Sequence, residues 1–151
     1  MKEDGIAAVS SLVRWRAFRE ALAERDRDAA AAAVRVAAQS RDDAEVAAEV
    51  IARRREGVLT APNFDLALLQ AVSAFETRAL DDVAARTDAL AERAREYALA
   101  RDAQVRARAD VRVAESRHGR LLAEAADRDE KRMFDRMASL IVAANGDTSD
   151  D

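Results

Sequence analysis

The sequence predicts an all-α protein, a long antiparallel two-helix coiled-coil hairpin with an overhanging C-terminal helix. The chain of 151 residues has only four glycines and one proline, so few residues that interrupt helices or build tight turns are present. Alanine supplies about a quarter of the chain and charged residues 36%, which leaves too few large apolar side chains for a compact core. Apolar residues recur every seven positions, which is the spacing of a coiled coil.

The first helix is expected over about residues 6–56, a stretch without glycine or proline that is rich in alanine, arginine and glutamate. Asp4 or Ser10 can cap its start, and Gly57 follows a basic run that favours a helix C-terminus. We expect the apolar residues at sevenfold spacing to form its half of the seam. They are Trp15, Leu22, Ala29, Val36 and Val50, with Phe18, Ala32 and Val46 beside them.

The joint is expected at about residues 57–63, where glycine and the single proline fall close together, and Thr60 or Asn63 can cap the helix that follows. The second helix is expected over about residues 64–144, although residues 57–75 could form either a loop or a short helix. Its two seam stripes are Val83, Leu90, Tyr97, Gln104 and Val111, and Ala79, Ala100, Ala107, Ala114 and Leu121, the second interrupted by Arg86 and Arg93. We therefore expect one hairpin over residues 1–145 and a disordered acidic tail over residues 146–151.

Antiparallel packing leaves the end of the second helix without an internal partner. A turn near residue 60 places residue i opposite about residue 119 − i, so Val9 lies near Asp110 and the overhang covers about residues 113–144. A wider tip shortens the overhang to about 20 residues. Apolar side chains on one face of the overhang are Met133, Phe134, Met137, Leu140, Ile141 and Ala144. Leaving this face in water would forfeit several kcal/mol, so we expect a partner, with bending back or dimerisation as the alternative.

The sequence lacks the motifs that indicate catalysis, a metal site or nucleic-acid binding. There is no cysteine, no Gly-x-Ser-x-Gly elbow and no glycine-rich phosphate loop, so we expect neither an enzyme nor a cofactor. Glu115 and His118 match half of a helical di-iron motif, but the chain has no second histidine to complete it. The net charge of −4 with interspersed signs predicts no nucleic-acid partner. No apolar run is long enough to cross a bilayer or to serve as a signal-peptide core, so we expect a cytosolic protein.

A charged segment near the C-terminus carries a family resemblance. It reads Asp129-Glu130-Lys131-Arg132-Met133, followed by Phe134-Asp135-Arg136-Met137-Ala138. The chain resembles the FliJ/YscO family, the small coiled-coil stalk proteins of flagellar and virulence-type type III secretion systems. It shares with this family the D-[EQ]-K-[KR]-M segment, the length, the lack of cysteine and the hairpin layout. The apolar residues that open the second helix, Phe64, Leu68, Leu69, Val72 and Phe75, also resemble the family pattern.

The resemblance implies a non-enzymatic cytoplasmic stalk associated with the inner-membrane export apparatus of a flagellar or virulence system. Its termini would enter the pore of a hexameric secretion ATPase, its joint would touch the export gate protein, and it would escort secretion chaperones. The implied ATPase-binding residues are Trp15, Phe18, Lys131, Arg132, Met133, Phe134, Met137, Leu140 and Ile141. The implied export-gate-binding residues are Val46, Val50, Phe64, Leu68, Leu69, Val72 and Phe75.

Two other functions remain open. An amphipathic protein that coats lipid or polyester granules would need an apolar stripe wide enough to lie on a surface along much of the chain. The predicted seam is narrow and filled with alanine, which disfavours this alternative. A plain homo-oligomeric coiled coil would need the overhang to pair with itself. For Trp15 and Phe18, packing in the seam is the competing explanation to partner binding.

Overall fold

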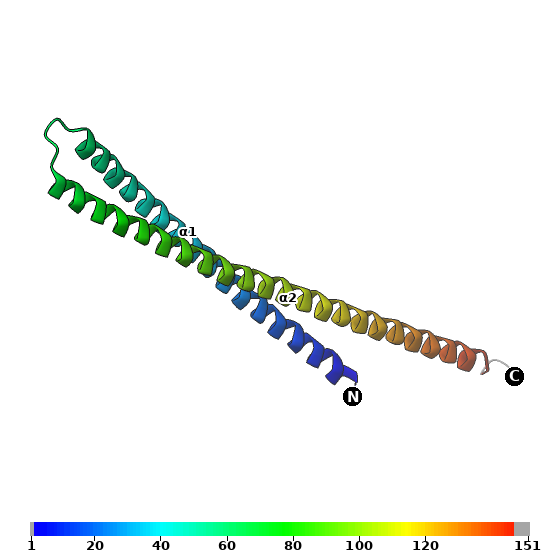
Figure 1. Cartoon of the computed structure of the whole chain (residues 1–151). Coiled ribbons are helices and arrows are strands. Elements are labelled where there is room, and N and C mark those ends of the chain that lie inside the picture. The colour runs from blue at the N-terminus through cyan, green and yellow to red at the C-terminus, as the bar shows by residue number, and fades with distance from the viewer. Residues whose placement is uncertain (1, 147–151) are drawn as a thin grey trace. The chain divides into compact units, whose positions relative to one another are not determined.

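The computed structural model describes residues 2–146, and the side chains of residues 5–143. Two long helices, α1 (Lys2–Thr60) and α2 (Leu66–Gly146), are joined by residues 61–65 (Figure 1). No strand occurs among the described residues, so the predicted all-α helical hairpin is confirmed. The chain divides into two compact units, which we describe separately: a terminal unit of Met1–Glu20 with Arg106–Asp151, and a joint unit of Ala21–Val105.

The joint lies a few residues later in the chain than predicted. Helix α1 does not stop at Gly57 but continues to Thr60, whose hydroxyl Oγ1 donates a hydrogen bond to the carbonyl oxygen of Glu56 at 3.0 Å. Pro62 explains the end of α1, because the residue before a proline is disfavoured in helical conformation. Residues of the predicted joint before Ala61 are therefore helical.

Asp65, rather than Thr60 or Asn63, caps the start of α2. Its carboxylate oxygen Oδ1 accepts hydrogen bonds from the backbone N–H groups of Ala67 at 2.9 Å and Leu68 at 3.1 Å. Its carbonyl oxygen accepts from the backbone N–H of Leu69 at 3.0 Å. These bonds satisfy N–H groups that the first turn of a helix leaves without partners, so α2 begins at Leu66.

The seam, which is the face that each helix packs against the other, follows the predicted stripes on α2. In the joint unit, Gln104 is buried, and Val83, Leu90 and Tyr97 are half-buried. Val72, which the predicted stripes did not include, is also buried in this seam. The interrupting residue Arg86 donates a hydrogen bond across the seam to Ser40. In the terminal unit, Val111 and Ala114 are buried and Leu121 is half-buried. The sevenfold spacing on α2 therefore identified the packed face.

On α1 the predicted seam stripe is wrong, because its residues lie on the outer face. Large members of that stripe are exposed: Trp15, Phe18, Leu22, Val36, Val46 and Val50. A second sevenfold stripe with smaller and more polar side chains packs against α2. Its members are Ile6, Val9, Val13 and Arg16 in the terminal unit, and Ala23, Ala30, Val34, Ala37, Ala44, Ala48 and Ile51 in the joint unit. Alanine allows two helix backbones to approach closely, which favours this face for packing over the bulkier one.

Arginines on the edge of the α1 seam are held by neighbouring carboxylates. In the joint unit, Arg41 Nη2 donates to Asp42 Oδ1 at 2.6 Å, and this hydrogen bond raises the pKa of the Arg41 guanidinium. Arg27 Nη2 donates to Asp28 Oδ1, also at 2.6 Å, which raises the pKa of Arg27 in the same way. Both arginines lie half-buried at the border of the seam.

Ion pairs between the helices show that the register differs from the prediction. In the terminal unit Arg16 pairs with Asp110, whereas the prediction placed Val9 near Asp110. Glu20 lies 3.9 Å from Arg108 in the same unit. In the joint unit Arg55 Nε lies 2.8 Å from Glu76 Oε2. The register is shifted because α1 runs through Gly57, which moves the tip toward the C-terminus. The shorter of the two expected overhangs, about 20 residues, fits this register.

Candidate partner-binding faces

The overhang of α2 presents an exposed apolar face in the terminal unit. Every described side chain from Asp129 to Ala143 is exposed. Five apolar residues on this stretch are 51–70% exposed: Met133, Phe134, Met137, Leu140 and Ile141. We call these five residues the C-terminal face. Val142, although exposed, lies on a different side of the helix.

The C-terminal face points away from the seam of α2. At about 100° per residue, its five side chains centre roughly 150° around the helix from the seam residues Leu121, Ala125 and Arg128. In the overhang, the residues that continue the seam spacing are Arg132, Asp135 and Ser139, and none of them belongs to the C-terminal face. A longer α1 would therefore pack on polar residues and would leave the C-terminal face uncovered.

The charged residues next to the C-terminal face form ion pairs along the helix. Lys131 Nζ lies 3.0 Å from Asp127 Oδ2, and Arg132 Nη1 lies 3.6 Å from Asp129 Oδ1. Pairs of this kind at the surface contribute at most about 1 kcal/mol, so they can rearrange when a partner binds. Lys131 and Arg132, which the family resemblance singles out, are thus accessible beside the apolar residues.

A second exposed apolar patch lies on α1 in the terminal unit. It consists of Leu12, Trp15 and Phe18, and the Trp15 and Phe18 side chains are 50% and 61% exposed. The guanidinium carbons of Arg16 and Arg19 stand 5.5 Å and 5.1 Å from the centre of the Trp15 ring. We call these three apolar residues the α1 patch. The sequence predicted Trp15 and Phe18 but not Leu12 and the two arginines, although these three residues stand at i−3, i+1 and i+4 from Trp15.

The structure does not bring the two sets of predicted ATPase-binding residues into one continuous surface. Trp15 and Phe18 point away from α2, because the packed face of α1 is formed by Val9, Val13 and Arg16. The C-terminal face lies on the side of α2 that is turned away from α1. A partner that touches both sets must therefore reach around the terminal unit.

Near the joint, the predicted gate-binding residues differ widely in exposure. Phe64, Leu68 and Phe75 are exposed, Leu69 is half-buried, and Val72 is only 6% exposed in the seam. Val72 is therefore a packing residue and is not free for a partner in this structure. Val46 and Val50 are exposed on the outer face of α1. The guanidinium of Arg78 stands 6.0 Å from the centre of the Phe75 ring.

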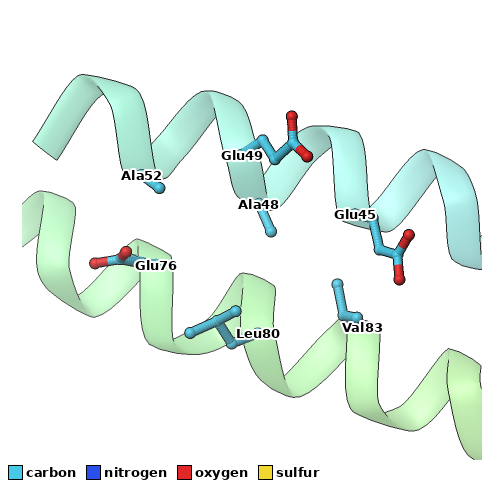
Figure 2. Close-up of a pocket in the computed structure, with 7 residues that line it drawn as sticks. All are labelled: Glu45, Ala48, Glu49, Ala52, Glu76, Leu80 and Val83. Atoms are coloured by element: carbon cyan, nitrogen blue, oxygen red, sulfur yellow. The ribbon is translucent and has the colours of Figure 1, made fainter. Parts of the chain in front are cut away.

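Hollows in the joint unit lie at the joint and between the two helices. One, of about 290 Å³, is lined at the joint by Val58, Ala61, Asn63, Asp65 and Leu68, with Arg54 and Gly57. The other, of about 280 Å³, lies where Ala48 of α1 points toward Leu80 and Val83 of α2 (Figure 2). The small alanine side chains leave this space between the helices. Both hollows are open to the surface and large enough to accept single side chains of a partner.

The three glutamates around the second hollow do not form an acidic binding site (Figure 2). Glu45 pairs with Arg41 at 3.8 Å, Glu49 with Arg53 at 3.4 Å, and Glu76 with Arg55 at 2.8 Å. Within the described part of the chain, no group of three or more histidine, aspartate and glutamate residues is placed to hold a metal ion. The described residues therefore offer exposed contact surfaces for another molecule.

No helix among the described residues is apolar enough along its length to cross a bilayer. Comparison of the chain with protein-family models, with curated proteins and with solved structures finds no significant match.

Proposed function

We propose that this protein is a non-enzymatic stalk that binds a hexameric secretion ATPase and an export gate protein, as FliJ/YscO-type proteins do. The observation that carries the proposal is the C-terminal face, whose five large apolar side chains are exposed on the side of α2 that α1 does not cover. The helical hairpin and the charged segment from Asp129 to Met133 support the assignment to this type of stalk.

A ring-shaped partner suits the two opposed apolar surfaces of the terminal unit. The α1 patch and the C-terminal face point in different directions, so a partner on one side of the unit would cover only one of them. The pore of a hexameric ring surrounds the molecule inserted in it. Its lining can therefore contact both surfaces, with the charged residues Lys131 and Arg132 beside the apolar contacts.

In the same proposal the joint contacts the export gate. Phe64, Leu68 and Phe75 are exposed, and Leu68 also lines the hollow at the joint. Val46 and Val50, which the resemblance also implies for the gate, are exposed on the outer face of α1. Secretion chaperones are the third proposed class of partner. This assignment places the protein in the cytoplasm at the export apparatus.

The proposal is tested by measuring binding of the purified protein to the purified export ATPase encoded in the same genome. Replacing Met133, Phe134 and Met137 together by alanine should weaken binding at least 100-fold, since apolar anchors dominate such interfaces. The matched control replaces Leu99, Val113 and Leu122, which are also exposed but lie outside the C-terminal face, and should bind normally. Circular dichroism should show equal helicity for all three proteins. Equal binding by both variants would contradict the proposal.

A second candidate, a protein that coats apolar granules or lipid surfaces, is favoured by the exposed stripe on α1. Trp15, Phe18 and Leu22 are exposed near its start, and Val36, Val46 and Val50 further along. The opposed directions of the two apolar surfaces in the terminal unit disfavour it, because one flat surface covers only one of them. Co-sedimentation with lipid vesicles and polyester particles distinguishes the candidates, since the stalk should remain in the supernatant.

A further inference from the structure

We propose that the C-terminal face also pairs with the same face of a second copy, in antiparallel orientation, to form a weak reversible dimer. This inference does not rest on the proposed ATPase binding. It concerns residues 129–143 in the terminal unit, where every described side chain is exposed and α1 provides no cover.

The spacing of the C-terminal face is the same in both directions along the helix. Its residues stand at positions 133, 134, 137, 140 and 141, which is symmetric about Met137. A twofold axis at Met137 therefore brings Met137 against Met137 of the second copy. It also brings Leu140 against Met133, and Ile141 against Phe134, each contact occurring twice. All five apolar side chains gain apolar neighbours in this arrangement, as a self-complementary interface requires.

The charges of the segment permit this pairing. Residues 129–143 carry three acidic side chains, Asp129, Glu130 and Asp135, and three basic ones, Lys131, Arg132 and Arg136. The segment is therefore neutral, and two copies do not repel each other. Because the C-terminal face points away from the seam, pairing does not require the hairpin to open.

The area of the C-terminal face limits how much surface the dimer can bury. Five side chains that are 51–70% exposed leave on the order of 100 Å² each, so two copies bury roughly 1,000 Å². This value is at the lower limit for a specific interface, so we expect a weak dimer. The free protein is thus a dimer only at high concentration, and an ATPase that binds the same face tightly displaces the second copy.

Sedimentation velocity of the purified chain alone, from about 1 to about 500 µM, tests the dimer. We expect a reversible monomer–dimer equilibrium. Met137→Glu, which places two carboxylates against each other at the axis, should leave a monomer with unchanged helicity. Val113→Glu, an exposed position outside the C-terminal face, should leave the equilibrium unchanged. A monomer at every concentration, or a dimer that survives Met137→Glu, would overturn the proposal.

Disulfide trapping tests the antiparallel orientation, because the chain has no cysteine of its own. Under mild oxidation, Met137→Cys should cross-link with itself. Met133→Cys should cross-link with Leu140→Cys in a mixture of the two variants, but only slowly with itself. Fast self-cross-linking of Met133→Cys would show parallel pairing and would contradict the proposed arrangement. Both experiments use this chain alone. Dimerisation can therefore be absent while ATPase binding is observed, and ATPase binding can be absent while the dimer forms.

Discussion

At the scale of single residues, Trp15 reports which face of α1 is packed. It is the only tryptophan, and its side chain is 50% exposed. We expect a fluorescence maximum typical of a solvated indole and efficient quenching by acrylamide. Trp15→Ala should change the free energy of unfolding by no more than about 0.5 kcal/mol, as is usual for surface substitutions. Val111→Ala, in the buried seam, is the control and should cost about 1–2 kcal/mol. A shielded indole would place the outer stripe of α1 in the seam instead.

Asp65 is the residue that starts α2. Because its carboxylate accepts hydrogen bonds from the backbone N–H groups of Ala67 and Leu68, Asp65→Ala should destabilise the protein by about 1 kcal/mol. Asn63→Ala should have little effect, since Asn63 lies in the connecting segment outside the cap. Urea unfolding followed by circular dichroism measures both changes. A larger loss for Asn63→Ala would mean that α2 begins earlier than in this structure.

At the scale of helices, Gly57 lies inside α1, which continues to Thr60. Glycine has no positive φ among the described residues, and a Cβ at Gly57 would meet no atom within 4 Å. Gly57→Ala should therefore stabilise the protein by about 0.5–1 kcal/mol, because glycine is a poor residue for a helix interior. A helix that ended at Gly57 in a left-handed conformation would be destabilised by the same substitution. Thermal unfolding distinguishes the two outcomes by the sign of the change in Tm.

The sequence predicts the packed face of α2 better than the packed face of α1, because the two helices differ in their sevenfold stripes. On α2 the largest regularly spaced residues, such as Leu90 and Tyr97, are also those that pack. On α1 two stripes share the sevenfold spacing, and the one with Trp15 and Leu22 is more apolar but lies outside. Spacing alone cannot choose between them, because close approach of two backbones favours small residues over large ones. The register prediction was wrong for a related reason, since glycine was taken as a stop within a continuous helix.

The candidate site was predictable where it depends on one helix alone. Spacing placed Met133, Phe134 and Met137 on one face, and that face is exposed in the structure. Residues that depend on the packing between helices were not predictable in the same way. Val72, expected to contact the export gate, is buried in the seam, and Trp15 points away from the seam in which it could have packed.

At the scale of the whole molecule, the protein has a larger accessible surface than a compact protein of the same mass. Its accessible surface is 11691 Å², whereas a compact monomer of 16.5 kDa exposes roughly 7,500 Å². No side chain among the described residues is less than 2% exposed. The chain thus buries little of its apolar surface by itself, and the proposed partners would cover the exposed apolar side chains.

The most direct test of the account is affinity capture from a lysate of the native host, with three baits compared by mass spectrometry. The baits are the native chain, the Met133/Phe134/Met137 alanine variant, and the Leu99/Val113/Leu122 alanine control. A secretion ATPase should be enriched with the native chain and the control but lost with the first variant. Capture of the ATPase by all three baits, or by none, would contradict the assignment of the C-terminal face as the ATPase-binding surface.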